Sequence, residues 1–232
     1  LMFGTSLYER SPRWLQETLI ASRSMARALL REGRAYRRVL RDIEGTQWLA
    51  REKLDGLVEE KLAQVLAVAF GSVPYYARYR DYARSDEPAV EVLRRLPCID
   101  KGDVRRAGLE MVARPRRALL FKGSTSGTTG APLTLYQDLA SIVRENAFIT
   151  RQLRWAGYMP GERRAWLRGD MIVPGSARNP PFWRLDRFGR MLMLSSFHLS
   201  EATAGHYLEA LARFDPVLIQ AFPSAIGFLA AY

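Results

Sequence analysis

In the stretch Ala118-Leu-Leu-Phe-Lys-Gly-Ser-Thr-Ser-Gly-Thr-Thr-Gly-Ala-Pro-Leu-Thr-Leu-Tyr136, small and hydroxyl-bearing residues lie between two apolar segments. Residues 118–121 form an apolar run, and residues 133–136 alternate as a half-buried strand does. Three glycines between them can adopt positive φ and turn backbone N–H groups toward one anion: Gly123, Gly127 and Gly130. Five hydroxyls add donors: Ser124, Thr125, Ser126, Thr128 and Thr129. The pattern predicts a strand–loop–strand element whose loop can hold phosphate.

The residue order excludes the commoner phosphate loop. That loop needs two glycines five positions apart, followed by Lys-Ser/Thr at the start of a helix. No glycine follows Gly123 at that distance, and Ala131-Pro132 stand where Lys-Ser/Thr would be needed. A Walker-type NTPase is therefore not expected. The composition alone also allows a flexible Ser/Thr/Gly connector between two strands.

The second half of the chain alternates expected strands and helices. Strands are expected at residues 164–167, 191–194 and 217–220, and helices at residues 138–157, 201–214 and from Pro223 onward. Short links between these elements indicate a parallel sheet, whose ligand sites lie at the carboxyl ends of its strands. Residues 195–199 and 221–224 are therefore the expected pocket. Residues 171–190 are rich in Pro and Gly and predict a long irregular loop on the substrate side.

The sequence thus predicts an α/β protein in two parts. Residues 1–95 form a helical N-terminal segment, and residues 96–232 form an α/β part. Ser11-Pro12 favours a helix that begins there and runs to about Arg41, with a weak point at Gly33. A second helix is expected from about Thr46 to Gly71, packed against the first.

The net charge of +11 comes mostly from arginine. Six arginines at spacings of three and four are expected along one helical stripe: Arg23, Arg27, Arg31, Arg34, Arg38 and Arg41. A solvated helix face is favoured over a recognition surface, because aromatic residues are not interleaved as stacking platforms. No nucleic-acid partner is expected, and a peripheral contact with an anionic surface is left open.

Cysteine and histidine usage limits the chemistry. Cys98 is the single cysteine, which excludes an internal disulfide and favours a reducing cytoplasm. His198 and His206 do not complete a metal-ligand pattern, so no metal site is expected among these residues. Cys98 is expected as a buried thiol, and Trp155, Trp166 and Trp183 are expected in the core. No apolar run approaches the roughly 20 residues of a membrane span.

Several motifs together resemble a known family. Thr125-Ser-Gly-Thr-Thr-Gly-Ala-Pro132 is similar to the signature loop of AMP-forming (adenylate-forming) carboxylate ligases. The phenylacetate–CoA ligase and CapK-like branch is resembled by further segments across residues 96–232: Leu96-Pro-Cys-Ile-Asp-Lys-Gly-Asp-Val104, Gly157-Tyr-Met-Pro-Gly-Glu-Arg163, Pro181-Phe-Trp183, Leu194-Ser-Ser-Phe-His-Leu-Ser200 and Phe222-Pro-Ser-Ala225. The chain is therefore identified by resemblance as the N-terminal part of such a ligase.

The resemblance implies ATP-dependent activation of a carboxylic acid to an acyl-adenylate, followed by transfer to CoA, another thiol or an amine. It assigns the nucleotide phosphates to Thr125, Ser126, Gly127, Thr128, Thr129 and Gly130. It assigns the acyl pocket to Ser196, Phe197, Phe222, Pro223 and Ser224. His198 is the candidate catalytic residue, able to orient the substrate carboxylate or gate the pocket, with a backbone-bonded strand-end histidine as the alternative.

Two positions depart from the family pattern. Leu133 stands where many relatives have lysine, with Lys122 as a substitute charge, and Ala221 stands where glycine is usual. The ligands of Mg²⁺, the ribose-binding aspartate and a late lysine are expected beyond Tyr232, so the 232-residue chain alone is expected to be a fragment or a truncated product without turnover. Two other functions remain open: an adenylyltransferase whose product keeps AMP, and a basic helical module that binds an anionic partner.

Overall fold

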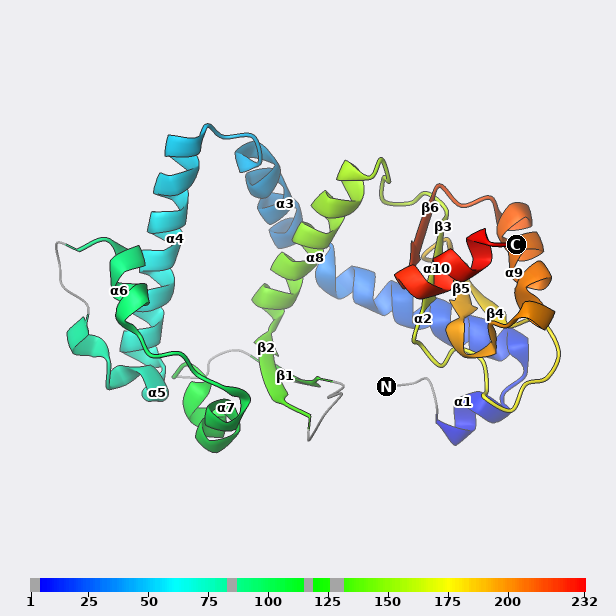
Figure 1. The fold of residues 1–232 in the computed structure, drawn as a ribbon, viewed down its shortest axis with the longest axis horizontal. Helices are drawn as coiled ribbons and strands as arrows, with labels where there is room; N and C mark the ends of the chain where they lie inside the picture. The colour runs from blue at the N-terminus through cyan, green and yellow to red at the C-terminus, as the bar shows by residue number, and fades with distance from the viewer. Residues whose placement is uncertain (1–4, 83–86, 115–118, 126–131) are drawn as a thin grey trace. The chain divides into compact units, whose positions relative to one another are not determined.

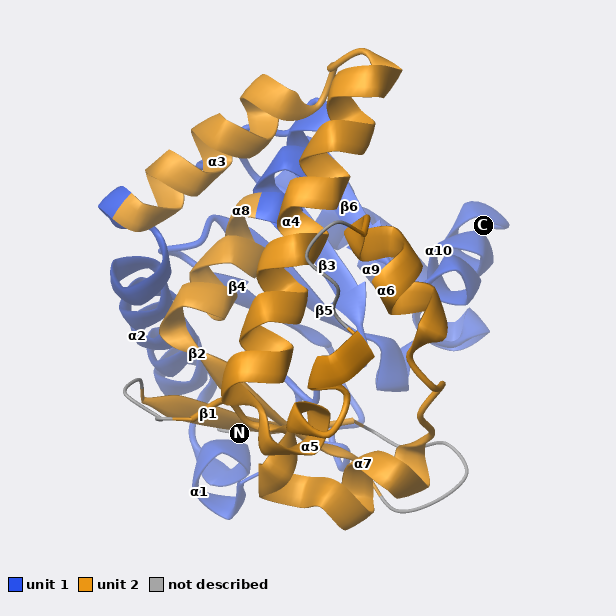
Figure 2. Cartoon of the chain, turned by 90° about the vertical axis from the view of Figure 1, so that its left-hand side faces the viewer, with its two compact units in different colours: residues 1–34, 148–232 blue, residues 35–147 orange. Residues whose placement is uncertain are grey.

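The computed structural model describes residues 5–82, 87–114, 119–125 and 132–232. They form two compact units, which are coloured separately in Figure 2. Unit 1 comprises Leu1–Arg34 and Phe148–Tyr232, and unit 2 comprises Ala35–Ala147. The α/β fold class expected from the sequence is confirmed. The expected division at residues 95 and 96 concerns the domains of the whole protein and stays a prediction.

A four-stranded sheet forms the centre of unit 1 (Figure 1). Its strands are β3 (Arg164–Arg168), β4 (Trp183–Asp186), β5 (Met191–Ser195) and β6 (Leu218–Ala221), in the order β4-β5-β3-β6. Strand β3 pairs in parallel with both β5 and β6, whereas β4 is antiparallel to β5. The expected parallel sheet is therefore correct for three strands, and β4 adds an antiparallel edge.

The sequence-based prediction of an irregular segment at residues 171–190 is wrong in part. Strand β4 lies within it, and Ile172 and Val173 are buried. Pro180 and Pro181 precede the strand, and buried Arg184 and Asp186 interrupt the apolar alternation that identifies a strand. Pairing with β5 nevertheless satisfies the backbone groups of β4 that face β5.

Helices cover both faces of this sheet. On one face, α9 (Glu201–Phe214) and α10 (Pro223–Ala230) bury Tyr207 and Leu229 against Leu167 and Leu194. On the other face, α1 (Ser6–Arg10) and α2 (Arg13–Arg31) bury Tyr8 and Ile20 against the methionines of β5. Alternate residues of β3 and β5 therefore enter two separate cores, as the pleat of a strand requires.

Buried polar side chains attach α1 and α2 to the sheet. Arg184 Nε donates to Gln16 Oε1 at 2.5 Å, and the same guanidinium donates to the Trp183 carbonyl at 2.7 Å. The Tyr8 hydroxyl donates to the Ile172 carbonyl at 2.7 Å, and burial raises the pKa of Tyr8 to about 12. Buried polar groups are stable when they are paired in this way, so the network fixes the position of α2 on β4.

The expected first long helix is divided. Helix α2 ends at Arg31, and α3 (Arg34–Thr46) begins after Glu32 and Gly33. The six arginines consequently lie on two helices, and the single continuous stripe is wrong. Gly33 lowers helix stability at this point because glycine loses more backbone entropy than other residues.

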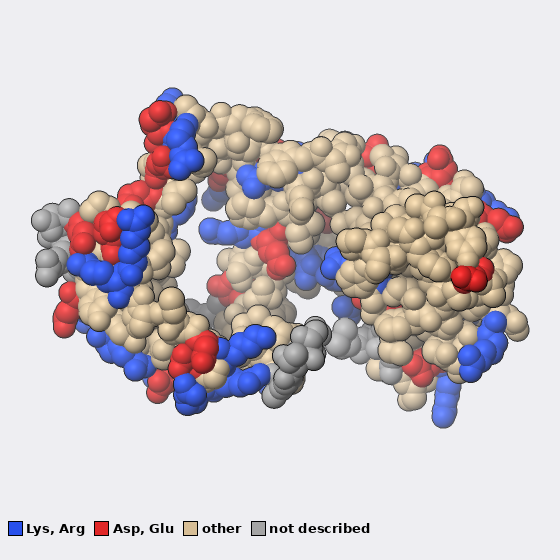
Figure 3. All heavy atoms as spheres, in the orientation of Figure 1, with Lys and Arg blue, Asp and Glu red and all other residues tan. Residues whose placement is uncertain are grey.

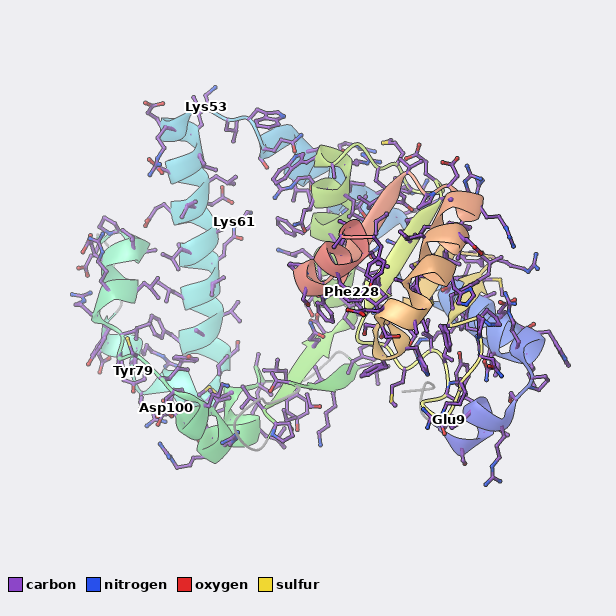
Figure 4. The ribbon with its side chains drawn as sticks, turned by 45° about the vertical axis from the view of Figure 1, so that its right-hand side comes forward. Glu9, Lys53, Lys61, Tyr79, Asp100 and Phe228 are labelled. Atoms are coloured by element: carbon purple, nitrogen blue, oxygen red, sulfur yellow. The ribbon has the colours of Figure 1, made fainter. Side chains whose placement is uncertain are left out.

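Unit 2 consists of helices and a hairpin. Its elements are α3, α4 (Arg51–Ser72), α5 (Pro74–Ala77), the 3-10 helix η1 (Arg80–Tyr82), α6 (Ala89–Arg95), α7 (Lys101–Ala107), the 3-10 helix η2 (Gly108–Met111), β1 (Leu120–Ser124), β2 (Thr134–Asp138) and the first part of α8 (Leu139–Trp155). Figure 4 shows Lys53 and Lys61 on α4. Within the unit, Tyr36 and Leu40 of α3 pack against Val143 and Ala147 of α8.

Helix α4 packs within its own unit. Leu66 and Phe70 are buried against Ala89 and Val92 of α6. Within each unit, the helices that were expected to pack together have other partners: α2 packs on β4 in unit 1, and in unit 2 α3 packs on α8 and α4 packs on α6. Periodicity shows which face of a helix is apolar but does not identify the element that covers it.

Several local predictions are confirmed. Asp100 caps α7, where Asp103 N donates to Asp100 Oδ1 at 2.8 Å. The backbone N–H of Asp100 donates to Asp103 in return, which lowers the pKa of the Asp103 carboxyl. Ser200 caps α9, and Pro223 opens α10. These signals depend on neighbouring residues alone.

Two burial predictions are wrong. Cys98 is exposed, although its apolar neighbours predict a buried thiol. Trp155 at the end of α8 is 57% exposed, with the Arg151 guanidinium 4.9 Å from its ring centroid. Trp166 and Trp183 do pack against the two cores of unit 1, as expected. Burial depends on contacts that are distant in sequence, so local composition predicts it poorly.

Charged side chains are distributed unevenly in Figure 3. Basic and acidic side chains alternate over the surface of α4, α6 and α7, whereas the surface over α9 and α10 is mostly uncharged. Among the residues that the structure describes, none of the helices combines the length and apolar character needed to cross a bilayer.

Candidate functional site

The Ser/Thr/Gly stretch connects the two antiparallel strands β1 and β2 in the sequence. Leu120 pairs with Asp138 and Ser124 pairs with Thr134, so the two strands of the predicted strand–loop–strand element are confirmed. Thr125 is the last described residue before the turn. The predicted phosphate-binding residues Ser126, Gly127, Thr128, Thr129 and Gly130 lie outside the described residues.

Thr125 closes the base of this turn. Its backbone N–H donates to the Leu133 carbonyl at 3.0 Å, and its Oγ1 accepts from the Leu133 N–H at 3.0 Å. A threonine hydroxyl that accepts one hydrogen bond still has its own proton to donate. The Thr125 hydroxyl therefore keeps a proton that it can donate to another group while it accepts from Leu133.

Three residues on β1 or just before β2, beside the Ser/Thr/Gly stretch, have described positions. Gly123 lies in β1 opposite Leu135, and it does not have positive φ, so it serves the strand rather than the anion-binding turn. Lys122 is exposed opposite Tyr136. Leu133, at the position where relatives have lysine, is half-buried. Lys122 as a substitute phosphate contact stays a prediction.

Sequence reasoning missed a cavity beside the hairpin. It has a volume of about 670 Å³ and is lined by residues of α7, η2, β1 and β2 together with the start of α8. Its wall is largely apolar, with Leu109, Met111 and Leu135, and Asp138 and Ser141 add polar groups. No sequence pattern indicates this cavity, because its walls come from segments that are separate in the chain.

In unit 1, the predicted acyl-pocket residues gather at one edge of the sheet. Ser196 and Phe197 follow β5, and Phe222, Pro223 and Ser224 follow β6. Both strands flank β3 in parallel, so their carboxyl ends meet on either side of Arg168. Ser196 Oγ donates to the Arg168 carbonyl at 3.1 Å, and Phe222 N donates to the Leu167 carbonyl at 3.1 Å. The structure therefore brings these five residues to the edge where α/β sheets bind ligands.

Aromatic rings at this edge are open to solvent. Phe197 is 59% exposed and Phe222 is 42% exposed. Gly169 follows β3 beside the Phe222 ring, and a Cβ at this glycine would lie 3.5 Å from the ring. A side chain at position 169 would therefore lie against the Phe222 ring.

His198 is held by the protein on several sides. It ends the 3-10 helix η3 (Ser196–His198), and its Nδ1 lies 2.8 Å from Ser195 Oγ. Its ring stacks on Phe182 with 5.1 Å between centroids. Burial lowers the pKa of His198, although a backbone hydrogen bond to Pro174 acts in the opposite direction.

These contacts favour a neutral, oriented imidazole. The Pro174 backbone and the Ser195 hydroxyl both interact with the ring, and the Ser195 contact is made through Nδ1. Direct contact with a substrate would require one of these bonds to break. The arrangement suits a residue that shapes the pocket, and the catalytic role of His198 stays a prediction. His206 lies on α9 and is exposed, as expected.

Sequence reasoning also missed Arg168 and its surroundings. The Arg168 guanidinium carbon lies 4.9 Å from the Trp166 ring centroid and 5.5 Å from the Phe222 ring centroid. Trp166 Nε1 donates to Asp170 Oδ2 at 2.6 Å, which fixes the indole. The sequence signal was the charged run Arg168-Gly-Asp170 directly after a predicted strand.

Metal-binding chemistry has little support in the described part of the chain. None of its described His, Cys, Asp and Glu side chains form a group of three or more that could hold an ion. The position of the Mg²⁺ ligands beyond residue 232 stays a prediction.

Comparison with known proteins gives two distant relatives. The chain is 26% identical over 140 residues to protein CapK of Staphylococcus aureus, which covers 60% of this chain and 31% of CapK. It is 33% identical over 117 residues to phenylacetate-coenzyme A ligase of Thermus thermophilus, which covers 49% of this chain and 26% of that enzyme. No protein-family model matches the chain.

These matches confirm a distant relationship to a ligase and to CapK. The chain spans less than a third of the length of either relative. The relationship therefore supports a ligase-like protein in general, and the particular reaction is a proposal.

Proposed function

We propose that this chain provides the phosphate-binding loop and one wall of the acyl site in an ATP-dependent, AMP-forming carboxylate ligase. The proposal is carried by the Ser/Thr/Gly sequence between β1 and β2, next to which Thr125 and Leu133 are hydrogen-bonded across the two strands. The distant relationship to a ligase supports the same reaction class. The activated acid then passes to CoA, another thiol or an amine.

In the first half-reaction, a carboxylate oxygen attacks the α-phosphorus of ATP. The bond between the α-phosphorus and the bridging oxygen breaks, and pyrophosphate leaves. Charge then accumulates on the departing phosphates, where fixed hydroxyl and backbone N–H donors stabilise it. The hydroxyl of Thr125, together with Thr128 and Thr129 on the sequence evidence, would supply such donors.

The acid is assigned to the strand edge of unit 1. The walls of this acid site are Phe197, Phe222 and the start of α10 at Pro223 and Ser224, and His198 follows Phe197 in η3. Exposed aromatic rings at the carboxyl ends of parallel strands suit the apolar body of an acid. In the second half-reaction, the acceptor thiol or amine attacks the acyl carbon, and AMP leaves.

Mg²⁺ commonly accompanies ATP and neutralises phosphate charge when it is bound. The described residues do not fit a metal site, because their acidic and imidazole side chains form no suitable group. The donors that the described residues themselves provide for phosphate are hydroxyl and backbone groups.

The test compares the rate of acid-dependent ATP–pyrophosphate exchange in the whole wild-type protein with the rates in the Thr128→Val and Thr129→Val variants. Valine keeps the branched shape but removes the hydroxyl, and each charge-assisted bond lost costs about 1.5–3 kcal/mol. Exchange should fall roughly 10- to 150-fold. Thr134→Val in β2 is the matched control and should exchange at the wild-type rate.

Transfer from a supplied acyl-adenylate distinguishes the loop's role from a folding defect. Pyrophosphate has already left this intermediate, so both loop variants should transfer at nearly the wild-type rate. Equal loss in both half-reactions would indicate a folding defect. Wild-type exchange in both loop variants would show that the stretch is only a connector.

A further inference from the structure

Arg168 lies at the carboxyl end of the middle strand β3, between the ends of β5 and β6 in the sheet of unit 1. It is the last residue of β3, directly opposite Ser195 in the register with β5. The loops after β5 and β6 flank it, since Ser196 contacts its carbonyl and the Phe222 ring lies beside its guanidinium. In a parallel sheet, this position is where ligands are bound.

The Arg168 guanidinium is held by aromatic rings. Trp166 and Phe222 both lie within the roughly 6 Å at which a cation is attracted to a ring face. Asp170 accepts the Trp166 indole N–H, so the ring that contacts Arg168 is itself fixed. The ring contacts therefore orient the Arg168 guanidinium group and leave its N–H donors available for hydrogen bonds.

Those donors have no carboxylate partner among the described residues. The nearby Asp170 accepts the Trp166 indole N–H, and none of the ion pairs between described residues joins Asp170 to Arg168. Arg168 is also exposed, so its charge faces solvent at the site edge. A planar fork of five donors matches the two oxygens of a carboxylate.

We propose that Arg168 binds the carboxylate group of the acid, with the rings of Trp166 and Phe222 beside the hydrocarbon body. This inference deepens the proposed function and rests on it. A carboxylate on an apolar body fits the surroundings better than a phosphate, because Met171 and Phe197 add further exposed apolar surface near the strand ends. The ligand class is thus a monocarboxylic acid with an apolar chain or ring.

Binding to the 232-residue chain tests the proposal without turnover. Hexanoate is titrated against the chain and the arginine Nε–Hε signals are followed by NMR, with hexanamide as the uncharged probe and pyrophosphate as the second anion. Hexanoate should bind saturably and shift one arginine signal, which Arg168→Gln should remove. Hexanoate binding should weaken at least tenfold in Arg168→Gln and less in Arg168→Lys. Arg213→Gln, at an exposed arginine of α9, should bind as the wild type does.

Each of several results would overturn the proposal. Equal binding of hexanoate and hexanamide would show that charge is not recognised. Unchanged hexanoate binding by a folded Arg168→Gln variant would exclude this arginine, and so would absence of saturable binding by the wild-type chain. Pyrophosphate that displaces hexanoate at equal or lower concentration would assign the site to phosphate.

Kinetics in the whole protein separate this inference from the proposed function. Arg168→Gln should raise the KM for the acid at least tenfold in ATP–pyrophosphate exchange and leave the KM for ATP unchanged. If the wild type shows no exchange while carboxylate binding depends on Arg168, the proposed function fails and the binding site stands. If exchange proceeds and Arg168→Gln leaves the KM for the acid unchanged, the inference fails and the function stands.

Discussion

Replacing Thr125 with valine removes one oxygen from the base of the loop and leaves the branched shape. The backbone hydrogen bond from Thr125 N to the Leu133 carbonyl is kept, whereas the Leu133 N–H loses the Oγ1 acceptor that now lies 3.0 Å away. Leu133 is half-buried, so water replaces the lost partner in part. The local cost should be about 0.5–1.5 kcal/mol, near that of an uncharged hydrogen bond.

Hydrogen exchange of the Leu133 amide measures this cost directly. Its protection should fall roughly two- to tenfold in Thr125→Val, since local opening sets the exchange rate. Binding of ATP to the 232-residue chain, measured by calorimetry, should weaken by about 1.5–3 kcal/mol if the hydroxyl also donates to phosphate. Thr125→Ser keeps the hydroxyl and should behave as the wild type in both assays. Unchanged amide protection together with unchanged ATP binding in Thr125→Val would refute the reasoning.

Three further changes test the strand edge and the basic helices. Tyr207→Phe removes the donor to the buried Ser195 carbonyl, now 2.7 Å away, and should lower the free energy of unfolding of unit 1 by about 1–3 kcal/mol in urea. A loss under about 0.5 kcal/mol would contradict the geometry. His198→Gln tests pH dependence. Burial lowers the pKa of His198 in the folded protein, so the unfolded chain binds more protons at acid pH. The free energy of unfolding of the wild type should therefore fall as the pH drops below about 6.5, and it should level off below the pKa of the folded protein. The Gln variant should lose this slope, the control His206→Gln should keep it, and an unchanged slope in the first would exclude His198 as its source. The last change reverses three basic side chains to Glu: Arg27, Arg31 and Arg38. Pyrophosphate exchange should stay within about tenfold of the wild type, or roughly 1.4 kcal/mol of barrier, and a greater loss would show that the basic helices take part in function.

Local signals predicted the elements around the site well. Asp100, Ser200 and Pro223 mark helix starts through hydrogen bonds or ring geometry within a few residues, and each is found where it is expected. The buried run Met191–Ser195 identified the central strand β5 because all of its residues are buried in the sheet. The order of these elements was sufficient to place Ser196 and Phe222 at one edge.

The rest depends on contacts between segments that are distant in sequence. Strand β4 escaped prediction because Arg184 and Asp186 are polar, and their burial makes sense only when Gln16 and Ser24 of α2 are beside them. The position of Arg168 in the site was not predicted because its aromatic partner Phe222 follows a different strand, β6. No residue pattern within a short window contains this information.

The reaction itself can be followed with an oxygen label. The whole protein is supplied with ATP, a thiol acceptor and an acid that supports exchange, with ¹⁸O in both carboxylate oxygens, and the nucleotide product is analysed by mass spectrometry. The attacking carboxylate oxygen stays on the α-phosphorus when the thiol displaces AMP, so AMP should carry one ¹⁸O and pyrophosphate should carry none. AMP without ¹⁸O, release of ADP and phosphate, or AMP retained on the acid product would contradict an AMP-forming ligase.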